Sequence, residues 1–405
     1  MITLQQALET VLQRAPEMEQ ERVVLADAGG CWLQQAITSD VDQPPADVSA
    51  MDGYAVRAAD VAAAPVELEV VGEIAAGAVP EFRVEPGQAA RIMTGALLPA
   101  GADAVQMVER TDDGDARVRI LEPVDAGSHV RRRGENLGQG DALLSRGQRI
   151  GAAEVGLLAG AGVVMVPVRR RPRVAIIPTG DELVEPGAQP GPGQIRNTNG
   201  YSLYQQIQEE GCLPFYLGIG RDDAGALDGK IAAGLAHDVL LLGGGVSMGK
   251  YDLVTSALER AGVEILFEKV AVKPGKPTVF GVRSSGGRTT LVFGLPGNPV
   301  SGMVMFRLLV APALRRMQGA TQDRSRLVRA RLTQALKPTA GRECYHPGRI
   351  AWGESGFEVA PVGHRGSGDL VAWRQANAMI RLPPDQGADL GEQVDVLPDR
   401  DHELR

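Results

Sequence analysis

The sequence predicts a multidomain α/β protein: a central parallel α/β sheet domain with an inserted small β-rich domain, an N-terminal helical segment and a C-terminal β-barrel-like domain. The chain has 405 residues, which is too many for one ordinary hydrophobic core. Between residues 172 and 322, apolar strand patterns alternate with helical patterns, as in a parallel sheet with right-handed crossovers. Residues 47–140 and 323–405 instead show short strand patterns separated by Gly, Pro and Asp. These observations together set the fold class.

The N-terminal segment begins with a helix. Thr3 and Gln6 have the spacing of a capping box, and apolar residues recur at helical spacing to about Arg14. A Gly/Ala-rich helical pattern covers residues 151–166, and Pro172 separates it from the next strand. The expected domains are residues 1–46 plus 141–171 (helical, linking), 47–140 (small β-rich), 172–322 (α/β) and 323–405 (barrel-like).

Short strands are predicted on both sides of the α/β region. The Asp52-Gly53 dipeptide is typical of a turn and precedes an apolar alternation. In the small β-rich domain the expected strands are residues 66–74, 89–93, 104–109 and 117–121. In the C-terminal domain they are residues 327–332, 350–352, 357–362, 378–382 and 393–397.

The α/β region predicts a cluster of loops at one sheet edge. Strands are expected at residues 174–178, 215–219, 238–242, 264–270 and 291–293, and helices at 199–210, 222–236, 253–261 and 299–317. Ligands of open α/β sheets bind beyond the carboxyl ends of the strands. The loops expected to converge there are residues 179–182, 220–223, 243–252 and 294–299.

One of these loops has the pattern of an anion cradle. Four aliphatic residues, 239–242, predict a buried strand, and three glycines from Gly243 to Gly245 follow it. Asp252 then precedes a helical pattern that ends at Gly262. A strand, a glycine loop and a helix N-terminus in this order present unpaired N–H groups to an oxyanion such as phosphate.

Two other interpretations of this loop remain open. Residues 244–250 match G-x-x-x-x-G-K, the phosphate loop of nucleoside triphosphatases. That motif needs Ser or Thr at the next position to hold Mg²⁺, and Tyr251 stands there instead. The loop is also compatible with a tight strand-to-helix turn that binds no ligand.

Carboxylates and lysines gather in the predicted loop cluster. The residues are Asp181, Glu182, Asp222, Asp223, Asp252, Lys273 and Lys276. Oxygen ligands beside cations fit a divalent ion shared with a phosphate-bearing ligand, and Mg²⁺ is the expected ion, with Zn²⁺ or another divalent ion also compatible. Asp222 and Asp252 also stand where helix N-caps belong, so each alone has a structural explanation.

Composition excludes several classes of protein. The net charge of −8 and the 4% aromatic content argue against binding of nucleic acid. No apolar run reaches the length of a membrane span, and the N-terminal helix is amphipathic, unlike a signal peptide. The three cysteines are far apart, without a C-x-x-C pair, as in a cytoplasmic protein with reduced thiols. The five histidines include no H-E-x-x-H zinc motif.

Seven motifs, spread over nearly the whole chain, resemble those of the molybdopterin molybdotransferases, a family that includes bacterial enzymes and the C-terminal domain of gephyrin. They are Met51-Asp52-Gly53-Tyr54-Ala55, Arg91-Ile92-Met93-Thr94-Gly95, Arg131-Arg132-Arg133-Gly134-Glu135, Pro178-Thr179-Gly180-Asp181-Glu182-Leu183, Gly244-Gly245-Val246-Ser247-Met248-Gly249, Lys273-Pro274-Gly275-Lys276-Pro277 and Leu295-Pro296-Gly297-Asn298-Pro299-Val300-Ser301. Each motif alone is weakly specific, whereas the ordered combination is highly specific.

The resemblance implies a four-domain, L-shaped homodimer that inserts molybdate into adenylylated molybdopterin, with release of AMP and formation of molybdenum cofactor. It implies that the α/β domain of one subunit faces the small β domain of the other, so that the cleft is shared. The expected partners are the two substrates and the molybdopterin adenylyltransferase that supplies the adenylylated one.

The resemblance also implies a set of site residues. The catalytic set is Asp52, Thr94, Glu182, Asp222 and Asp252, of which Glu182, Asp222 and Asp252 are the implied metal ligands. The substrate-binding set is Arg131, Gly244, Gly245, Ser247, Lys269, Lys273, Lys276, Pro296, Pro299 and Ser367. Two residues depart from the family pattern, since Asn136 and Lys250 stand where relatives often have acids.

Three functions therefore stay in view: the transferase, a nucleotide hydrolase related to the phosphate-loop enzymes, and a non-catalytic molybdopterin-binding scaffold. The transferase would release AMP only in the presence of molybdate. The hydrolase would turn over ATP without molybdate. A scaffold would need a partner-binding segment, and the sequence offers no clear one.

Overall fold

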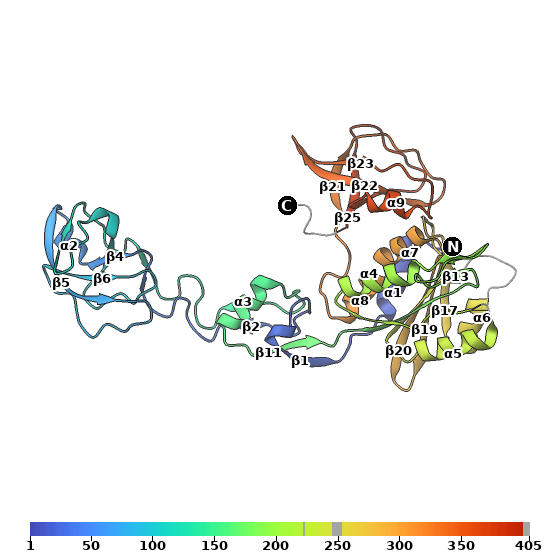
Figure 1. Cartoon of the computed structure of the whole chain (residues 1–405), viewed down its shortest axis with the longest axis horizontal. Helices are drawn as coiled ribbons and strands as arrows, with labels where there is room; N and C mark the ends of the chain where they lie inside the picture. The colour runs from blue at the N-terminus through green and yellow to red at the C-terminus, as the bar shows by residue number, and fades with distance from the viewer. Residues whose placement is uncertain (222, 245–252, 400–405) are drawn as a thin grey trace. The chain divides into compact units, whose positions relative to one another are not determined.

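The computed structural model describes residues 1–221, 223–244 and 253–399 (Figure 1). The chain forms two compact units. The first unit contains Met1–Gln35, Arg146–Ala152 and Met165–Arg405, and the second contains Ala36–Ser145 and Ala153–Val164. The chain leaves the first unit and later returns to it, so the second unit is an insertion in sequence. The finer division into four domains stays a prediction.

A five-stranded sheet forms the centre of the second unit, in the order β7-β4-β6-β5-β8. The strands are β4 (Gly53–Val56), β5 (Val66–Ile74), β6 (Gln88–Ile92), β7 (Ala104–Met107) and β8 (Arg117–Ile120). Because successive residues of a strand point to opposite faces, β4 places Tyr54 and Ala55 in two different apolar clusters. Each predicted strand of this region is present, with its ends shifted by at most two residues.

Smaller elements complete the second unit. The short strands pair as β3 (Val48–Ser49) with β9 (Val130–Arg131) and β2 (Ile37–Thr38) with β10 (Ala142–Leu144). The helical elements are α2 (Ala58–Val61), η2 (Val108–Arg110) and α3 (Ala152–Gly160). The predicted helix 151–166 is thus too long at its C-terminal end, where Gly162 has a left-handed φ of +70°.

The first unit contains a six-stranded mixed sheet in the order β15-β12-β16-β20-β19-β17. Its strands are β12 (Arg173–Pro178), β15 (Leu213–Tyr216), β16 (Val239–Gly243), β17 (Glu264–Lys269), β19 (Pro277–Ser285) and β20 (Arg288–Leu295). The first four in spatial order are parallel, as predicted. Next to them, β19 runs antiparallel to both of its neighbours, β20 and β17. The sequence analysis missed β19, which joins β20 through a two-residue Gly286-Gly287 hairpin turn with both φ positive.

Helices cover both faces of this sheet (Figure 1). One face packs against α1 (Leu4–Arg14), α4 (Asn199–Glu209), α7 (Pro299–Met305), the π-helical turn η3 (Phe306–Val310) and α8 (Ala311–Met317). The other packs against α5 (Ala224–Gly234) and α6 (Leu253–Arg260). Both faces of the parallel strands are therefore buried, which explains the uninterrupted apolar runs in their sequences.

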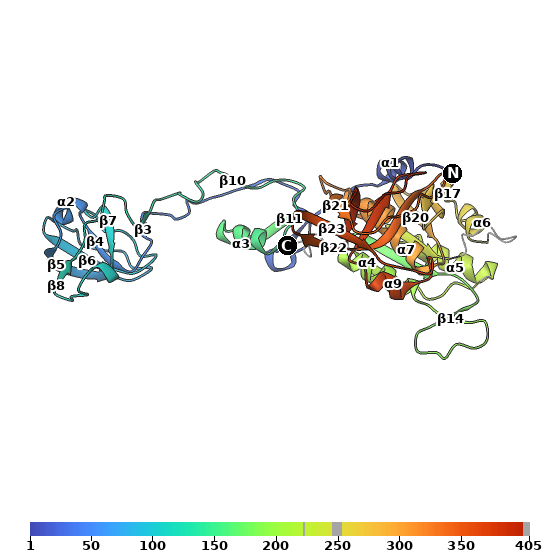
Figure 2. The same cartoon turned by 90° about the horizontal axis from the view of Figure 1, so that it is seen from above.

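Short strands flank the sheet. β1 (Gln20–Val24), followed by η1 (Leu25–Asp27), pairs antiparallel with β11 (Met165–Arg169). β13 (Leu183–Val184) and β14 (Ile195–Arg196) pair in parallel within the long loop after β12. In Figure 2 the part of that loop around β14 extends away from the sheet.

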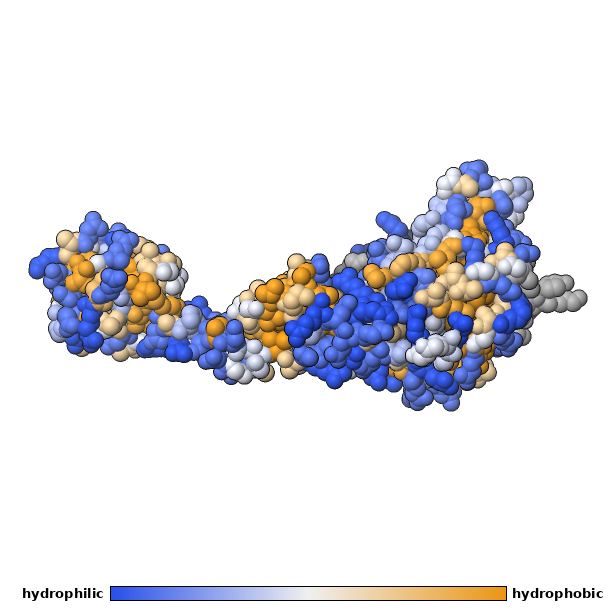
Figure 3. Space-filling view, turned by 90° about the horizontal axis from the view of Figure 1, so that it is seen from below, coloured by the Kyte–Doolittle hydropathy of each residue, from blue (hydrophilic) through white to orange (hydrophobic). Residues whose placement is uncertain are grey.

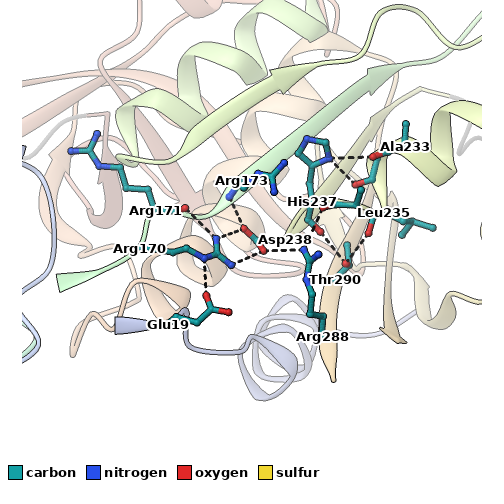
Figure 4. A network of polar contacts seen from close by, with 12 residues as sticks. Glu19, Arg170, Arg171, Arg173, Ala233, Leu235, His237, Asp238, Arg288 and Thr290 are labelled. Atoms are coloured by element: carbon teal, nitrogen blue, oxygen red, sulfur yellow. Dashed lines mark hydrogen bonds and ion pairs between the residues drawn. The ribbon is translucent and has the colours of Figure 1, made fainter. Parts of the chain in front are cut away.

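The amino end of β16 is held by a polar network around Asp238 (Figure 4). Asp238 is only 3% exposed, and its carboxylate accepts two hydrogen bonds from Arg170, at 2.6 and 2.9 Å. It also accepts one from the Arg173 N–H at 2.8 Å and lies 3.5 Å from Arg288. Burial alone would raise the pKa of Asp238, but these hydrogen bonds and charges outweigh it and lower the pKa. The network therefore stabilises the charged carboxylate inside the protein.

The C-terminal region closes into a five-stranded barrel, as predicted. Its strands are β21 (Val328–Leu332), β22 (Glu343–Gly353), β23 (Gly356–Pro361), β24 (Ala378–Leu382) and β25 (Gln393–Pro398), with the helix α9 (Leu370–Arg374) between β23 and β24. They pair in the order β22-β23-β21-β25-β24, and β24 pairs again with β22. The short strand β18 (Val272–Lys273) joins β22 from the outside and connects the barrel to the α/β sheet.

Within the described part of the chain, no helix combines the length and the apolar character needed to cross a membrane.

Candidate functional site

The carboxyl ends of β12, β16 and β20 are tied together by backbone hydrogen bonds that continue into their loops. The Thr179 N–H donates to the Gly243 carbonyl at 2.9 Å, and the Gly244 N–H donates to the Leu295 carbonyl at 3.0 Å. The predicted convergence of loops at this edge therefore holds for the described parts of these loops. Gly244, a predicted substrate-binding residue, lies at their centre.

Glu182 is held by the shape of its own loop. Gly180 has a φ of +141°, and a Cβ added to it would lie 2.4 Å from the Glu182 carboxylate oxygens. The carboxylate therefore folds back over Gly180, a position that only glycine leaves free. Arg221 fixes the loop from the other side, because its Nη1 donates to the carbonyls of Asp181 and Leu183, both at 3.0 Å.

Three polar side chains at this edge do not fulfil their usual local role among the described residues. The Thr179 hydroxyl is buried and has no hydrogen-bond partner among the described residues. Thr198 and Asn298 are the N-cap residues of α4 and α7, and neither side chain caps its helix. Asn199 instead donates to the Gly297 carbonyl at 2.8 Å, which joins the first turn of α4 to the loop after β20. The first turns of α4 and α7 thus lie at the same edge, where the positive ends of the helix dipoles favour an anion.

The barrel contributes Ser367 to the loop after β20. Its Oγ accepts from the Asn298 side-chain amide at 2.8 Å, and its carbonyl accepts from the Val300 N–H at 3.1 Å. Pro296 is buried just before this point, and Pro299 is the first residue of α7. The structure therefore brings together three predicted substrate-binding residues, Pro296, Pro299 and Ser367.

Three predicted lysines lie in the segment from β17 to β19: Lys269 on β17, Lys273 on β18 and Lys276 directly before β19. Lys269 is the last residue of β17. The N–H of the residue after it, Val270, donates to the Lys276 carbonyl at 3.0 Å, so Lys269 and Lys276 are close in space. Lys273 lies on β18, opposite Cys344 of the barrel. The Lys273 and Lys276 side chains are exposed and form no ion pair with any described residue. Their charges are therefore available to an anionic ligand.

The Cys344 thiol, opposite Lys273, is neutral and does not compensate the charge of the lysine. The Cys344 Sγ lies 3.2 Å from the His346 Nε2. Burial, together with the nearby charges of His364 and Lys273, lowers the pKa of His346 to about 4. Burial raises the pKa of Cys344. The thiol and imidazole are thus both neutral near pH 7, and the Lys273 charge is not offset by a thiolate.

Several predicted site residues lie outside the described residues: Asp222, Gly245, Ser247 and Asp252, together with Lys250. Among the described residues, no group of three or more His, Cys, Asp and Glu side chains is arranged to hold a metal ion. Of the predicted metal ligands, the structure therefore places Glu182 alone.

In the second unit, Asp52 and Thr94 form one contact. The Asp52 carboxylate accepts from the Thr94 N–H at 2.6 Å and from its hydroxyl at 2.8 Å. These two hydrogen bonds, the backbone one first, lower the pKa of Asp52. Thr94 therefore keeps Asp52 charged and oriented, and its hydroxyl proton is already donated.

The structure separates the members of the arginine triplet. Arg132 forms an ion pair with Asp47 at 2.6 Å, and Arg133 with Asp42 at 2.5 Å. Arg131 is exposed and forms no ion pair with a described residue. The first arginine of the run is thus the one available to a ligand, whereas the other two hold the local structure. Asn136 is exposed, and its N–H donates to the Gln43 carbonyl at 2.9 Å.

Sequence reasoning missed three residues that shape this site: Arg221, Asn199 and Asn298. Asn298 lies inside a motif that carried the resemblance, and Arg221 directly precedes the predicted ligand Asp222. These positions were therefore visible in the sequence. Their roles were not, because each depends on a carbonyl or hydroxyl far away in the chain.

Three family models match the chain in order. The description "MoeA N-terminal region (domain I and II)" applies to residues 2–162, "Probable molybdopterin binding domain" to residues 175–316, and "MoeA C-terminal region (domain IV)" to residues 329–398. The third match coincides with the barrel and the second with the α/β sheet.

Individual relatives agree with these models. The chain is 38% identical over 374 residues to the molybdopterin molybdenumtransferase of a Nostoc species, covering 91% of this chain and 86% of that one. It is 35% identical over 406 residues to the enzyme of the same name from Bacillus subtilis, covering 98% and 94%. The solved molybdopterin biosynthesis MoeA protein of Pyrococcus horikoshii OT3 superposes with a TM-score of 0.82 at 30% identity, covering 98% and 100%. By fold, motif order and near-complete coverage, the chain belongs to the molybdopterin molybdenumtransferase family.

Proposed function

We propose that this chain inserts molybdenum from molybdate into adenylylated molybdopterin, with release of AMP, as the final step of molybdenum cofactor biosynthesis. As a family member, the chain is a transferase of that biosynthesis. The observation that carries the proposal is the carboxyl edge of the sheet, where helix N-termini and unpaired lysines face solvent within a chain matched from end to end. Neither alternative, a nucleotide hydrolase or a scaffold, is favoured by that match.

The charges suit an anionic substrate. Lys273 and Lys276 would bind the oxyanions of molybdate or of the pyrophosphate as mobile point charges with several donors. The positive ends of the α4 and α7 helix dipoles at this edge would favour the same anionic groups. Arg131 of the second unit would supply another cation, because it has no ion pair of its own among the described residues.

The predicted metal ligands fit a hard divalent ion. Glu182, Asp222 and Asp252 offer only oxygen donors, which Mg²⁺ prefers. Bound there, the ion would neutralise charge on the phosphoanhydride. Glu182 is suited to this role because its carboxylate is exposed and is held in place by its loop.

No side chain is assigned as a nucleophile. Transfer at phosphorus needs mainly positioning and charge neutralisation, both of which this edge provides. An oxygen of molybdate or of water would attack the phosphorus of the adenylyl group, the bond between the two phosphates would break, and AMP would leave with that oxygen. The two dithiolene thiols would replace an oxygen on molybdenum, which leaves as water with the two thiol protons. Asp52, charged and fixed by Thr94, would orient the substrate from the second unit.

We further place this site between two copies of the chain. The helix α3 offers an apolar surface for such a dimer, since Leu157 is 40% exposed and Val164, just after the helix, is 71% exposed. In Figure 3 hydrophobic residues gather over the part of the molecule that contains α3. The adenylylated substrate would come from a molybdopterin adenylyltransferase, which is the expected protein partner.

One assay tests the reaction. Purified protein is incubated with adenylylated molybdopterin and Mg²⁺, and AMP is measured with and without molybdate. We expect AMP release that requires molybdate. Equal release without molybdate would indicate a hydrolase, and no release under either condition would contradict the transferase.

A second assay tests the shared site. Co-expressed Asp52→Ala and Asp252→Ala subunits should form heterodimers with one intact site, so part of the activity should return. Heterodimers without activity would place both residues in the site of the same subunit.

A further inference from the structure

An aromatic and acidic cluster at the carboxyl edge has no role in the function described so far. It consists of Tyr201 on α4, Tyr216 at the end of β15 and Glu185 in the loop after β13, and is here named the tyrosine shelf. The Tyr216 hydroxyl donates to the Glu185 Oε1 at 2.5 Å, and the Tyr201 hydroxyl donates to the Oε2 at 3.1 Å. The two rings lie 5.6 Å apart and are tilted by 37°. Both phenols thus fix one carboxylate.

The shelf is built on a rigid, tightly packed turn. Asn197, which is 2% exposed, donates to the Tyr216 hydroxyl at 2.9 Å and accepts from the Gly200 N–H at 3.0 Å. A Cβ added to Gly200 would lie 2.8 Å from Pro178 and 2.9 Å from the Tyr216 ring. Glycine therefore allows α4 to pack directly on the strand ends, and this packing sets the position of the shelf.

The same turn of α4 reaches the anion-binding loops. Asn199, two residues before Tyr201, donates to the carbonyl of Gly297. Tyr201 lies against Tyr216 of β15, and one strand, β12, separates β15 from β16 in the sheet. A ligand with an anionic group at those loops would have a planar group within reach of the shelf.

The exposure of the shelf is unusual for a structural contact. Tyr201 is 50% exposed, although its hydroxyl is held by Glu185 and one side of its ring faces Tyr216. The remaining ring surface is an ordered aromatic platform, and stacking on such a surface suits any planar heterocycle. Each carboxylate oxygen accepts one phenol and has a second lone pair for another donor.

We propose that the tyrosine shelf binds the pterin ring of the substrate, which stacks on Tyr201 while its exocyclic amine and adjacent ring N–H donate to Glu185. This inference rests on the proposed function, which supplies a substrate with two heterocycles. The carboxylate distinguishes them: a pterin presents two adjacent N–H donors, as guanine does, and fits a carboxylate with two oxygens. Adenine presents one amine beside a ring acceptor, so it makes a single such hydrogen bond.

Binding of a hydroxymethyl pterin tests the assignment, because stacking quenches the fluorescence of the pterin. We expect Tyr201→Ala to weaken pterin binding about tenfold or more. Tyr201→Phe keeps the ring and should stay within about threefold of wild type. Glu185→Gln should weaken binding about tenfold, because it replaces an acceptor with a donor facing the pterin N–H groups.

Matched controls separate the shelf from general damage. Tyr204→Ala removes a 36% exposed tyrosine from the same helix and should leave pterin binding unchanged. AMP binding, measured in parallel, should be the same in every variant. Thermal unfolding of each variant checks folding, and Tyr201→Phe keeps the test valid if Tyr201→Ala is unstable.

The outcomes distinguish the shelf from the proposed function. Three results would overturn the assignment. The wild-type protein could fail to bind the pterin, or wild type and Tyr201→Ala could bind it equally well. The third result is that Tyr201→Ala loses affinity for AMP and keeps its affinity for the pterin. If wild type still releases AMP in response to molybdate in that case, only the shelf is wrong. If that release is absent while pterin binding follows the expected order, the shelf stands and the reaction is wrong.

Discussion

The two ends of the parallel strands differ in how far their polar groups are paired within the described residues. At the amino end, Asp238 is almost completely buried, and every charge around it is matched by arginines and backbone N–H groups. At the carboxyl end, the Thr179 hydroxyl is buried without a partner among the described residues, and Lys273 and Lys276 are exposed without an ion pair there. Among the described residues, the amino end satisfies its own polar groups, whereas the carboxyl end leaves one hydroxyl and two ammonium groups without a partner. Stability and ligand binding should therefore respond to different mutations.

The largest expected effect is at the amino end. Asp238→Ala leaves the Arg170 guanidinium partly buried and without its main partner, so the free energy of unfolding should fall by about 3 kcal/mol. Urea denaturation measures this loss. As a control, Asp228→Ala breaks an ion pair with Arg260 in which both side chains are about half exposed, and should cost less than about 1 kcal/mol. Equal losses in the two variants would contradict the idea that the amino end is a stabilising network.

The same carboxylate predicts a dependence of stability on pH. The folded state lowers the pKa of Asp238 below its unfolded value of about 3.9. The contribution of the charged carboxylate is therefore complete above the unfolded pKa and is lost as the pH falls through the folded pKa. The difference in unfolding free energy between wild type and Asp238→Asn should be constant near neutral pH and should shrink below about pH 4. If the difference in unfolding free energy grew as the pH fell, the folded state would raise the pKa of Asp238, which is the opposite of this prediction.

The sequence predicted the carboxyl edge better than the amino edge. Strand alternation, loop order and motifs placed Glu182, Gly244 and the lysines correctly at or near the strand ends. The Asp238 network was not predicted, because it joins Arg170 and Asp238 through a fold that the local pattern does not reveal. Arg170 lies in the segment 141–171, which the sequence predicted only as helical and linking.

The differences between the predicted and the observed fold also come from contacts that the local sequence pattern does not reveal. The strand β19 was missed although its two-residue glycine turn is a strong hairpin signal, because the alternating α/β pattern favoured parallel strands throughout. In the second unit, the resemblance pointed to Arg131, but the local pattern did not show that Arg132 and Arg133 are the members that form ion pairs. That depends on Asp42 and Asp47, whose side chains reach Arg133 and Arg132 across about ninety residues of chain.

At the carboxyl end, mutations should change ligand binding and leave stability unchanged. Lys273→Ala and Lys276→Ala should each raise the molybdate concentration for half-maximal AMP release about tenfold, or about 1.4 kcal/mol. Their unfolding free energy should stay within about 0.5 kcal/mol of wild type. Glu182→Gln should instead raise the Mg²⁺ requirement, because it removes a negative metal ligand. An unchanged molybdate response in both lysine variants would show that they bind another part of the substrate.

The smallest expected effect compares two buried threonines at opposite ends of the sheet. Thr290, at the amino end, is 4% exposed, and its hydroxyl donates to the His237 carbonyl at 2.9 Å. Thr290→Val keeps the shape of the side chain but leaves that carbonyl with one donor fewer, so the unfolding free energy should fall by about 1 kcal/mol.

Thr179, at the carboxyl end, is 3% exposed and its hydroxyl has no partner among the described residues. Thr179→Val therefore removes a desolvated hydroxyl that gains nothing in the free protein, and the unfolding free energy should stay the same or rise by up to about 1 kcal/mol. Chemical denaturation of the two variants side by side measures both changes. Opposite signs are expected because, within the part of the chain that the structure describes, Thr290 has a partner and Thr179 has none. Equal losses in the two variants would remove the distinction between the two ends.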